Sequence, residues 1–435
     1  MSQVVSSSVP NPSAAAAGPA AWSRHDTTWM LGLYGTAIGA GTLFLPINAG
    51  IGGLWPLLLM AIIAFPLTYF SHRGLNRFVM SSRRPGSDIT EVVEEHFGSA
   101  AGKIITLLYF LTIYPILMLY SVAVTNTVES FMINQLGLAD WVPHRAVLSL
   151  ILILSLMAIV RLGAEMIVKA MSLLVYPFVA ALMILAIYLI PEWSSAAFDS
   201  AGSFSDAVSG VTFWKTVWLA IPVMVFSFNH SPIISSFAVD QQRLHGEHAE
   251  PASSRVLFRA HAMMVVSVMF FVFSCVMSLS PADLMAAKEQ NISILSYLAN
   301  HFSTPAIAWA APLIAIIAIS KSFLGHYMGA KEGFNGLIQQ ELRQRGKVVS
   351  GSLLDRSAAV FMILSCWMAA TFNPSIIGTI ESLGGPVIAA LLFLMPMYAI
   401  AKVPSMKKYS GAFSNIFVVL IGLIAMTAIF FDLLS

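Results

Sequence analysis

The sequence predicts an all-α polytopic membrane protein with eleven apolar spans, arranged as two blocks of five and one added helix. Composition is the first observation behind this fold class: 57% of the 435 residues are hydrophobic and only 10% are charged. Soluble domains carry roughly 25% charged residues. The second observation is that apolar runs of about 20 residues recur along the chain, each long enough to cross about 30 Å of hydrocarbon.

The third observation is that two apolar segments are interrupted at corresponding places in the two blocks. The predicted spans are residues 29–50, 53–71, 102–131, 145–162, 164–190, 215–239, 256–279, 305–337, 357–373, 376–400 and 412–434. The interruptions fall in the first and the sixth. Such a pair of breaks is the best sequence pointer to the binding site of a transporter.

Basic residues set the expected orientation. Arg73, Arg77, Arg83 and Arg84 all lie in the connection between the second and third spans. Because cytoplasmic loops carry the excess of Lys and Arg, we expect the N-terminus inside and the C-terminus outside. The net charge of +2 indicates no class of partner by itself.

The domain organisation follows from these spans. Residues 1–25 are rich in Ser, Ala and Pro and are expected to form a disordered cytoplasmic tail. Residues 26–190 and 215–400 form the two blocks, and 412–434 is the additional span. An odd number of spans gives the blocks opposite orientations, which is how an inverted repeat arises.

Three connections carry a structural expectation. Residues 86–98 are expected to form a short acidic surface helix on the cytoplasmic side. Residues 281–303 have apolar side chains at helical spacing and could cover the exterior entrance. Residues 240–255 are expected to be a polar cytoplasmic loop, in which His245 and His248 are solvated and not metal ligands.

The first break is glycine-rich and is expected to bind substrate. Glycines free the backbone to unwind, and the N-terminus of the half-helix that follows offers N–H groups to a carboxylate. The candidate residues here are Thr36, Ala37, Gly39, Ala40 and Gly41. Close helix packing through Gly35 and Gly39 is the alternative interpretation.

The second break reads FSFNHSP from Phe226 and places several polar side chains at membrane depth. Such side chains are costly there unless they face a cavity. Freed carbonyls can accept an ammonium, so the two breaks together describe a dipolar ligand, an α-amino acid. The candidates are Asn229, His230 and Ser231, with Phe226 and Phe228 as gates or as plain core aromatics. Tyr120 and Ser121 of the third span are further pocket candidates.

Ionisable residues inside spans are the candidates for coupling. Lys321 lies near the middle of the eighth span, and His326 follows one to two turns later. Burial penalises the charged form of a lysine, so this side chain could gain and lose a proton. Glu381 is the candidate carboxylate partner or second proton site. A permanent structural Lys321 cation remains the alternative.

Four segments resemble the bacterial hydroxy/aromatic amino acid permease family, and within it the inner-membrane L-serine:proton symporters. They are WMLGLYGTAIGAGTLFLPINAGIGG from Trp29, FSFNHSPIISSFAV from Phe226, SKSFLGHYMGAKEGFNG from Ser320 and IESLGGP from Ile380. The resemblance runs from about Trp22 to the C-terminus. It implies a LeuT-type fold, import of serine driven by protons, and a Lys321 ammonium where sodium-coupled relatives hold an ion between the first and eighth spans.

Other functions are weighed against this one. A sodium-coupled or exchanging amino acid transporter remains open, although Lys321 would repel a sodium ion. A non-transporting amino acid sensor would need a larger soluble output domain. The sequence shows no catalytic set, metal-ligand set or nucleotide-binding loop, so no enzyme activity, cofactor, metal, nucleic acid or obligatory protein partner is expected.

Overall fold

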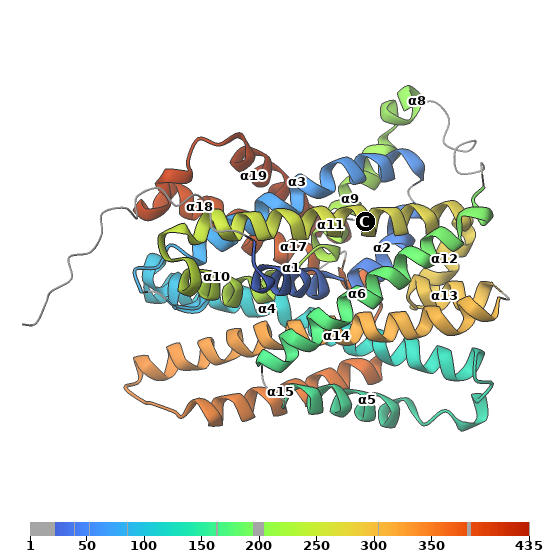
Figure 1. The fold of residues 1–435 in the computed structure, drawn as a ribbon, viewed down its shortest axis with the longest axis horizontal. Coiled ribbons are helices and arrows are strands. Elements are labelled where there is room, and N and C mark those ends of the chain that lie inside the picture. Colours follow the sequence, from blue (N-terminus) through green and yellow to red (C-terminus); the bar gives the residue numbers. More distant parts are fainter. Residues whose placement is uncertain are drawn as a thin grey trace, which may run out of the picture.

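The structure is a computed structural model, and it describes residues 22–38, 40–51, 53–84, 86–161, 164–194, 204–302, 304–380 and 384–434. The regular secondary structure in these ranges is helical. Figure 1 shows the long helices running side by side along the longest axis of the molecule. This arrangement confirms the predicted all-α fold class.

The first half of the chain contains two broken or bent helices. Its helices are α1 (Arg24–Ala37), α2 (Ala40–Ile51), α3 (Leu54–Val79), α4 (Ile89–Asn134), α5 (Arg145–Val160) and α6 (Ala164–Tyr188). Gly98 interrupts α4 with a φ of 78°, a conformation that glycine adopts readily. The residues before Gly98 form the short acidic helix predicted there, and Asp88 caps it through the N–H groups of Thr90 and Glu91.

The second half contains the second helix break, between Ser227 and Ser231. Its helices are α8 (Phe204–Ser209), α9 (Val211–Ser227), α10 (Ser231–His245), α11 (Ala249–Ser278), α12 (Pro281–Glu289), α13 (Ile294–His301), α14 (Pro305–Gln344), α15 (Gly351–Phe372), α16 (Ile376–Thr379), α17 (Gly385–Ala389), α18 (Met395–Lys402) and α19 (Phe413–Leu434). A π-helical turn, Ala390–Leu394, joins α17 to α18. Short 3₁₀ turns lie at Ala139–Trp141, Ile190–Glu192, Gly246–His248 and Pro404–Tyr409.

In the described part of the chain, seven helices are long and apolar enough to cross a membrane. The pair Arg24–Ala37 and Gly41–Ile51, bent by 53°, makes an eighth candidate span. Three shorter apolar helices are Arg145–Val160, Phe213–Ser227 and Phe413–Ala428. Helical segments therefore lie at the place of every predicted span, while the number of crossings and the repeat boundaries stay predictions.

The predicted loop at residues 240–255 is wrong. Helix α10 continues to His245, and α11 already begins at Ala249. Only the turn Gly246–His248 separates them, with Gly246 at a φ of 52°. Some of the polar side chains that suggested a loop are exposed, such as Arg243 and Glu247, whereas Gln241 and Ser253 are buried between helices.

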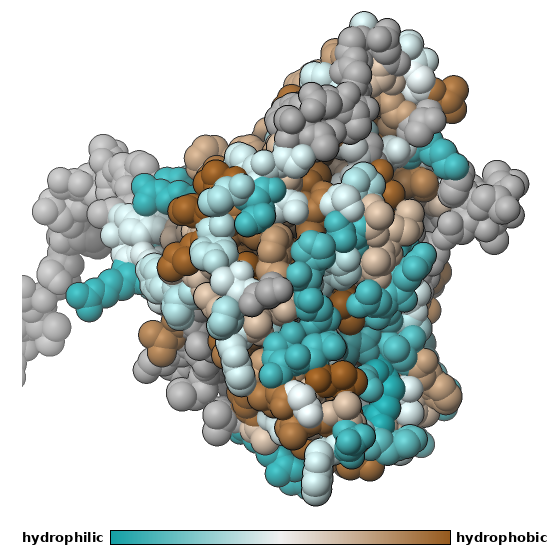
Figure 2. Space-filling view, turned by 90° about the vertical axis from the view of Figure 1, so that its right-hand side faces the viewer, coloured by the Kyte–Doolittle hydropathy of each residue, from teal (hydrophilic) through white to brown (hydrophobic). Residues whose placement is uncertain are grey.

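The amphipathic segment at one end of the bundle folds as two short helices, α12 and α13. Helix α12 packs against α2, and α13 packs against α14. Ile292, Leu295 and Leu298 are buried, as their spacing predicts. Figure 2 views the end of the bundle that lies to the right in Figure 1, and a broad hydrophilic patch covers part of it.

Candidate functional site

The first break separates α1 from α2. Helix α1 ends at Ala37, and Ile38 takes an extended conformation with ψ at 101°. The Ile38 N–H donates the last helical hydrogen bond of α1, to the Tyr34 carbonyl at 3.1 Å. The Ile38 carbonyl is thereby turned away from the helix and free to bond elsewhere. Thr36 is buried, and its hydroxyl donates a hydrogen bond to the Gly32 carbonyl of the same helix.

The second break separates α9 from α10. Helix α9 ends at Ser227, and α10 begins at Ser231 with Pro232 in its first turn. Proline suits this position because the first turn needs no N–H from it. Asn229 lies between the helices and accepts a 3.1 Å hydrogen bond from the Ser231 N–H. Its side chain therefore replaces a helical acceptor at the start of α10.

The two breaks contact each other directly. The Ser227 hydroxyl donates to the Gly41 carbonyl at 2.9 Å, and the Thr42 hydroxyl donates to the Ser227 carbonyl at 3.3 Å. A Cβ on Gly41 would lie 2.7 Å from Phe226 Cδ1 and 2.8 Å from Ser227 Cα. Glycine is therefore required at residue 41 by the close approach of α9. The contact brings the N-terminal end of α2 to the C-terminal end of α9. Close helix packing and a binding site both produce such an approach.

Helix α14 contacts the first break through its polar residues. The Ser322 hydroxyl donates to the freed Ile38 carbonyl at 2.7 Å. The neighbouring Lys321 is 1% exposed, and its Nζ lies 4.3 Å from the ring centroid of Phe178 on α6. Among the described residues, Nζ has no hydrogen-bond partner. The ammonium is thus enclosed beside α6 with an aromatic face as its near neighbour.

The remaining predicted residues of α4 and α14 are buried close by. The His326 ring packs edge-on against Tyr120, with centroids 4.8 Å apart. His326 Nδ1 bonds to the Ser322 carbonyl at 2.9 Å. Ser121 is buried, and its hydroxyl donates to the Leu117 carbonyl of its own helix at 3.1 Å. Tyr120 is therefore next to the candidate site, whereas the Ser121 hydroxyl is already engaged.

Several polar atoms around the breaks are buried without a hydrogen-bond partner in the described ranges. They are Asn229 Nδ2, His230 Nε2, Ser231 Oγ, Lys321 Nζ and His326 Nε2. Unsatisfied buried polar groups are rare in native proteins, and each calls for an explanation. These five atoms leave hydrogen-bonding capacity for a ligand beside the two breaks.

Some predicted residues lie outside what the structure describes. Gly39 and Glu381 are not in the described ranges, and of Ala40 only the backbone is described, at the start of α2. Ala37, Phe226 and Phe228 are described and buried. Phe226 lies between the backbones of α2 and the segment before α17, since a Cβ on Gly384 would approach its ring at 3.3 Å.

Sequence reasoning missed several residues of this region. Nothing in the sequence marks Ser322, because a lone serine in an apolar helix gives no signal of its tertiary partner. His72 and His261 come from two other helices and lie beside His230. Glu332, three turns after Lys321 on α14, has its Oε1 buried and unpartnered among the described residues. A carboxylate inside a helix of this hydropathy was a visible signal for the last of these.

Each end of the bundle is tied by polar contacts. At one end the Trp29 Nε1 donates to Asp240 at 2.7 Å, which joins α1 to α10. At the other end Arg145 pairs with Glu129, and Asn126 donates to the Asn291 carbonyl at 2.8 Å. The candidate site lies between these contacts with its side chains enclosed.

The chain is similar in sequence to known proteins along nearly its whole length. The sequence profile of the tryptophan/tyrosine permease family matches residues 28–430. The serine transporter SdaC of Escherichia coli K12 is 66% identical over 415 residues, which are 95% of this chain and 96% of that protein. SdaC of Shigella flexneri is 65% identical over 415 residues, which are again 95% of this chain and 96% of that protein.

Solved structures share the fold at low sequence identity. MhsT in complex with L-phenylalanine has a TM-score of 0.58 at 16% identity, covering 95% of this chain and 98% of that one. A manganese transporter of Eremococcus coleocola has a TM-score of 0.61 at 12% identity, covering 94% and 85%. A Na⁺-coupled sialic acid symporter has a TM-score of 0.55 at 12% identity, covering 93% and 89%. The fold is therefore of the LeuT type, as the resemblance implied.

Proposed function

The chain belongs to the tryptophan/tyrosine permease family, and from this premise we propose that it imports L-serine together with protons by alternating access. It is a multi-pass membrane transporter and not an enzyme. The single observation that carries the proposal is the reciprocal pair of hydrogen bonds between the two helix breaks, beside polar atoms without partners. Discontinuous helices that meet in this way form the substrate site in transporters of this type.

The two half-helix ends suit the two charges of an amino acid. The N-terminus of α2 presents backbone N–H groups and the positive end of its dipole, which favour the carboxylate. The carbonyls at the C-terminal end of α9 favour the ammonium. Asn229 Nδ2 and Ser231 Oγ are left to bond a hydroxyl on the substrate side chain. The similarity to the serine transporters supports serine as that substrate.

Lys321 is the group proposed to carry the coupled proton. A charged side chain in the membrane interior is expensive, and by default it marks an ion or proton pathway. The adjacent Ser322 bonds the Ile38 carbonyl, so a change of charge at Lys321 acts next to the first break. Sodium coupling is the alternative, and a charged Lys321 would oppose it by repulsion. His326 and Glu381 are proposed as secondary proton carriers.

We place the protein in the bacterial inner membrane with its N-terminus in the cytoplasm, following the distribution of basic residues. Its partners in this proposal are the amino acid, the proton and the lipid bilayer. No cofactor and no further protein take part in the proposed cycle.

The test is uptake of radiolabelled L-serine into proteoliposomes that hold either a proton gradient or a sodium gradient. Wild-type protein is expected to accumulate serine under the proton gradient without sodium. Unlabelled L-threonine, added as a competitor, reports on selectivity, since one extra methyl group is worth only about 1–3 kcal/mol in a pocket.

The Lys321→Ala variant is expected to lose the dependence of uptake on the pH gradient. Lys347→Ala is the matched control, since Lys347 is an exposed cation just beyond the end of α14. Uptake driven by sodium, or proton-driven uptake unchanged in Lys321→Ala, would remove Lys321 from the mechanism. No serine uptake under either gradient would overturn the substrate.

A further inference from the structure

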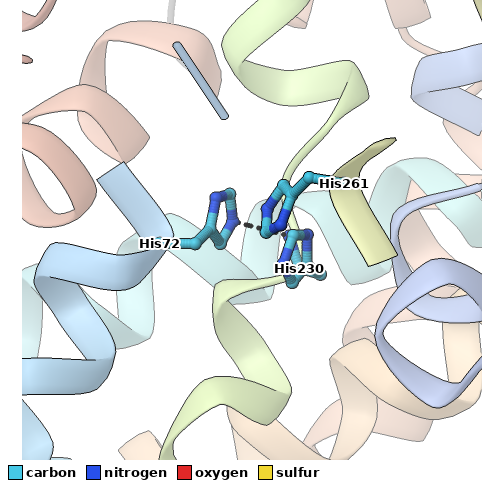
Figure 3. A group of neighbouring side chains, drawn as sticks. All are labelled: His72, His230 and His261. Carbon is cyan, nitrogen blue, oxygen red and sulfur yellow. Dashed lines mark hydrogen bonds between the residues drawn. The ribbon is translucent and has the colours of Figure 1, made fainter. Parts of the chain in front are cut away.

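Three buried histidines from three separate helices form one cluster (Figure 3). His72 comes from α3, His230 from the second break and His261 from α11. One ring nitrogen of each lies within 4.8 Å of a ring nitrogen of both others. The His72 and His230 rings stack with centroids 3.7 Å apart, and His261 lies 4.7 Å from His230.

The backbone around the cluster fixes the tautomer of each ring. Each Nδ1 bonds to a main-chain carbonyl, at 2.8 Å for His72, 3.0 Å for His230 and 2.6 Å for His261. A carbonyl only accepts, so each Nδ1 must carry the hydrogen of the neutral ring. The lone pair of every ring is therefore on Nε2.

These lone pairs have little else to bond. His230 Nε2 and His261 Nε2 are buried and have no hydrogen-bond partner among the described residues. His72 Nε2 accepts one hydrogen bond of 3.2 Å from the His230 N–H. The ring of Tyr69 lies 5.9 Å from that of His261, and it adds a wall to the site. Three ring nitrogens with lone pairs thus lie close together in the protein interior, and one long hydrogen bond from the His230 N–H is the only one they accept among the described residues.

We propose that His72, His230 and His261 bind a divalent transition-metal ion, with Zn²⁺ as the representative ligand. Neutral imidazole is a preferred ligand for Zn²⁺, Cu²⁺ and Ni²⁺, whereas Mg²⁺ and Ca²⁺ require oxygen ligands. Histidines that ligate metals almost always donate their other ring N–H to a carbonyl or carboxylate, as all three do here. Three histidines and one water are a known set of zinc ligands.

Binding requires a rearrangement of side chains, in which His72 Nε2 exchanges its hydrogen bond from the His230 N–H for the ion. Two ligands at about 2.0–2.1 Å from one ion lie at most about 4.2 Å apart, so the widest separation in the cluster must shorten. The His72 and His230 rings lie within 4° of parallel, and one of them must turn for their lone pairs to converge. Water at the fourth position of Zn²⁺ ionises near pH 7, and the hydroxide halves the charge buried in the membrane.

The ion would connect three elements that lie far apart in the sequence. His230 is the residue immediately before α10, so a bound ion ties the second break to α3 and α11. Binding at this cluster does not depend on the proposed serine transport, and it is measured without transport.

The test is calorimetric titration of the purified full-length protein, carrying no polyhistidine tag, with ZnCl₂ and with MgCl₂. We expect one tightly bound Zn²⁺ per chain and no comparable heat from Mg²⁺. His261→Gln should weaken Zn²⁺ binding at least about tenfold. His248→Gln is the matched control, because His248 is exposed and pairs in sequence with His245 as the competing surface site. This control should bind as the wild type does.

A second readout covers the case in which His261→Gln fails to fold. Co²⁺ added to wild-type protein should give the visible absorption of tetrahedral cobalt, and His72→Gln should abolish it. The proposal is overturned if the wild-type protein binds no stoichiometric Zn²⁺. It is equally overturned if His248→Gln loses the ion while the cluster variants keep it.

Discussion

Replacing Gly41 by alanine should push the two helix breaks apart and weaken substrate binding. The alanine Cβ would lie 2.7 Å from Phe226 Cδ1 and 2.8 Å from Ser227 Cα, whereas ordinary contact begins at 3.4 Å. The Phe226 ring can turn, but Ser227 Cα is backbone and can move only with α9. The 2.9 Å hydrogen bond from the Ser227 hydroxyl to the Gly41 carbonyl is therefore stretched.

The cost follows from these contacts. Overpacking of this kind costs about 1–3 kcal/mol, and the hydrogen bond adds about 0.5–1.5 kcal/mol where it is lost. If this overpacking destabilises only the conformation that binds serine, the apparent serine affinity drops by about 5-fold to 150-fold. The same strain should lower the Tm of the protein in detergent.

The assay is serine binding to purified protein, with the Tm of each variant measured alongside. Gly351→Ala is the matched control, since an added Cβ there has open space and the residue is helical. That control should keep wild-type affinity. Wild-type affinity and Tm in Gly41→Ala would refute the reasoning that the close contact of α2 and α9 builds the site.

Three further predictions concern other contacts. Ser322→Ala removes the donor to the Ile38 carbonyl and should lower serine affinity by about 2-fold to 12-fold, whereas Ser322→Thr should retain most of it. Asn126→Ala removes the bond to the Asn291 carbonyl and should lower the Tm seen by intrinsic fluorescence, and an unchanged Tm would contradict this role. Burial raises the pKa of Asp283, but hydrogen bonds from Ser280, the N-cap of α12, and from Tyr297 of α13 outweigh it and hold that pKa below the usual 3.8. The ionised Asp283 carboxylate therefore stabilises the folded protein above the unfolded pKa of 3.8, and this stabilisation is lost as pH falls through the lower pKa of the folded state. Pepsin should cut α12 of Asp283→Asn at pH 4.5 but cut the wild type there only at lower pH.

The breaks and the fold could be predicted because their causes are local. A cluster of glycines in an apolar span, or a proline directly after a polar run, favours a break in the helix. Isolated prolines such as Pro46, Pro66 and Pro115 lie inside helices of this chain. Lys321 was visible for a similar reason, since a charge inside an apolar span is conspicuous. The burial of Lys321 and the break at residues 228–230 confirm these parts of the prediction.

The contacts between helices could not be predicted from one sequence. The bond from Ser322 to Ile38 joins residues 284 positions apart, and nothing in either segment specifies the other. His72 and His261 are single histidines in their helices, and only the packing of α3 and α11 brings them to His230. The error at residues 240–255 has another cause, because polar residues such as Gln241 and Ser253 also occur inside packed helices.

The measurement that tests the central claim most directly is proton movement evoked by serine. Proteoliposomes containing a pH-sensitive dye, with no sodium and no imposed gradient, receive L-serine outside. The account predicts acidification of the lumen with wild-type protein and with Lys347→Ala, and none with Lys321→Ala. Serine entry without acidification in the wild type would contradict proton coupling.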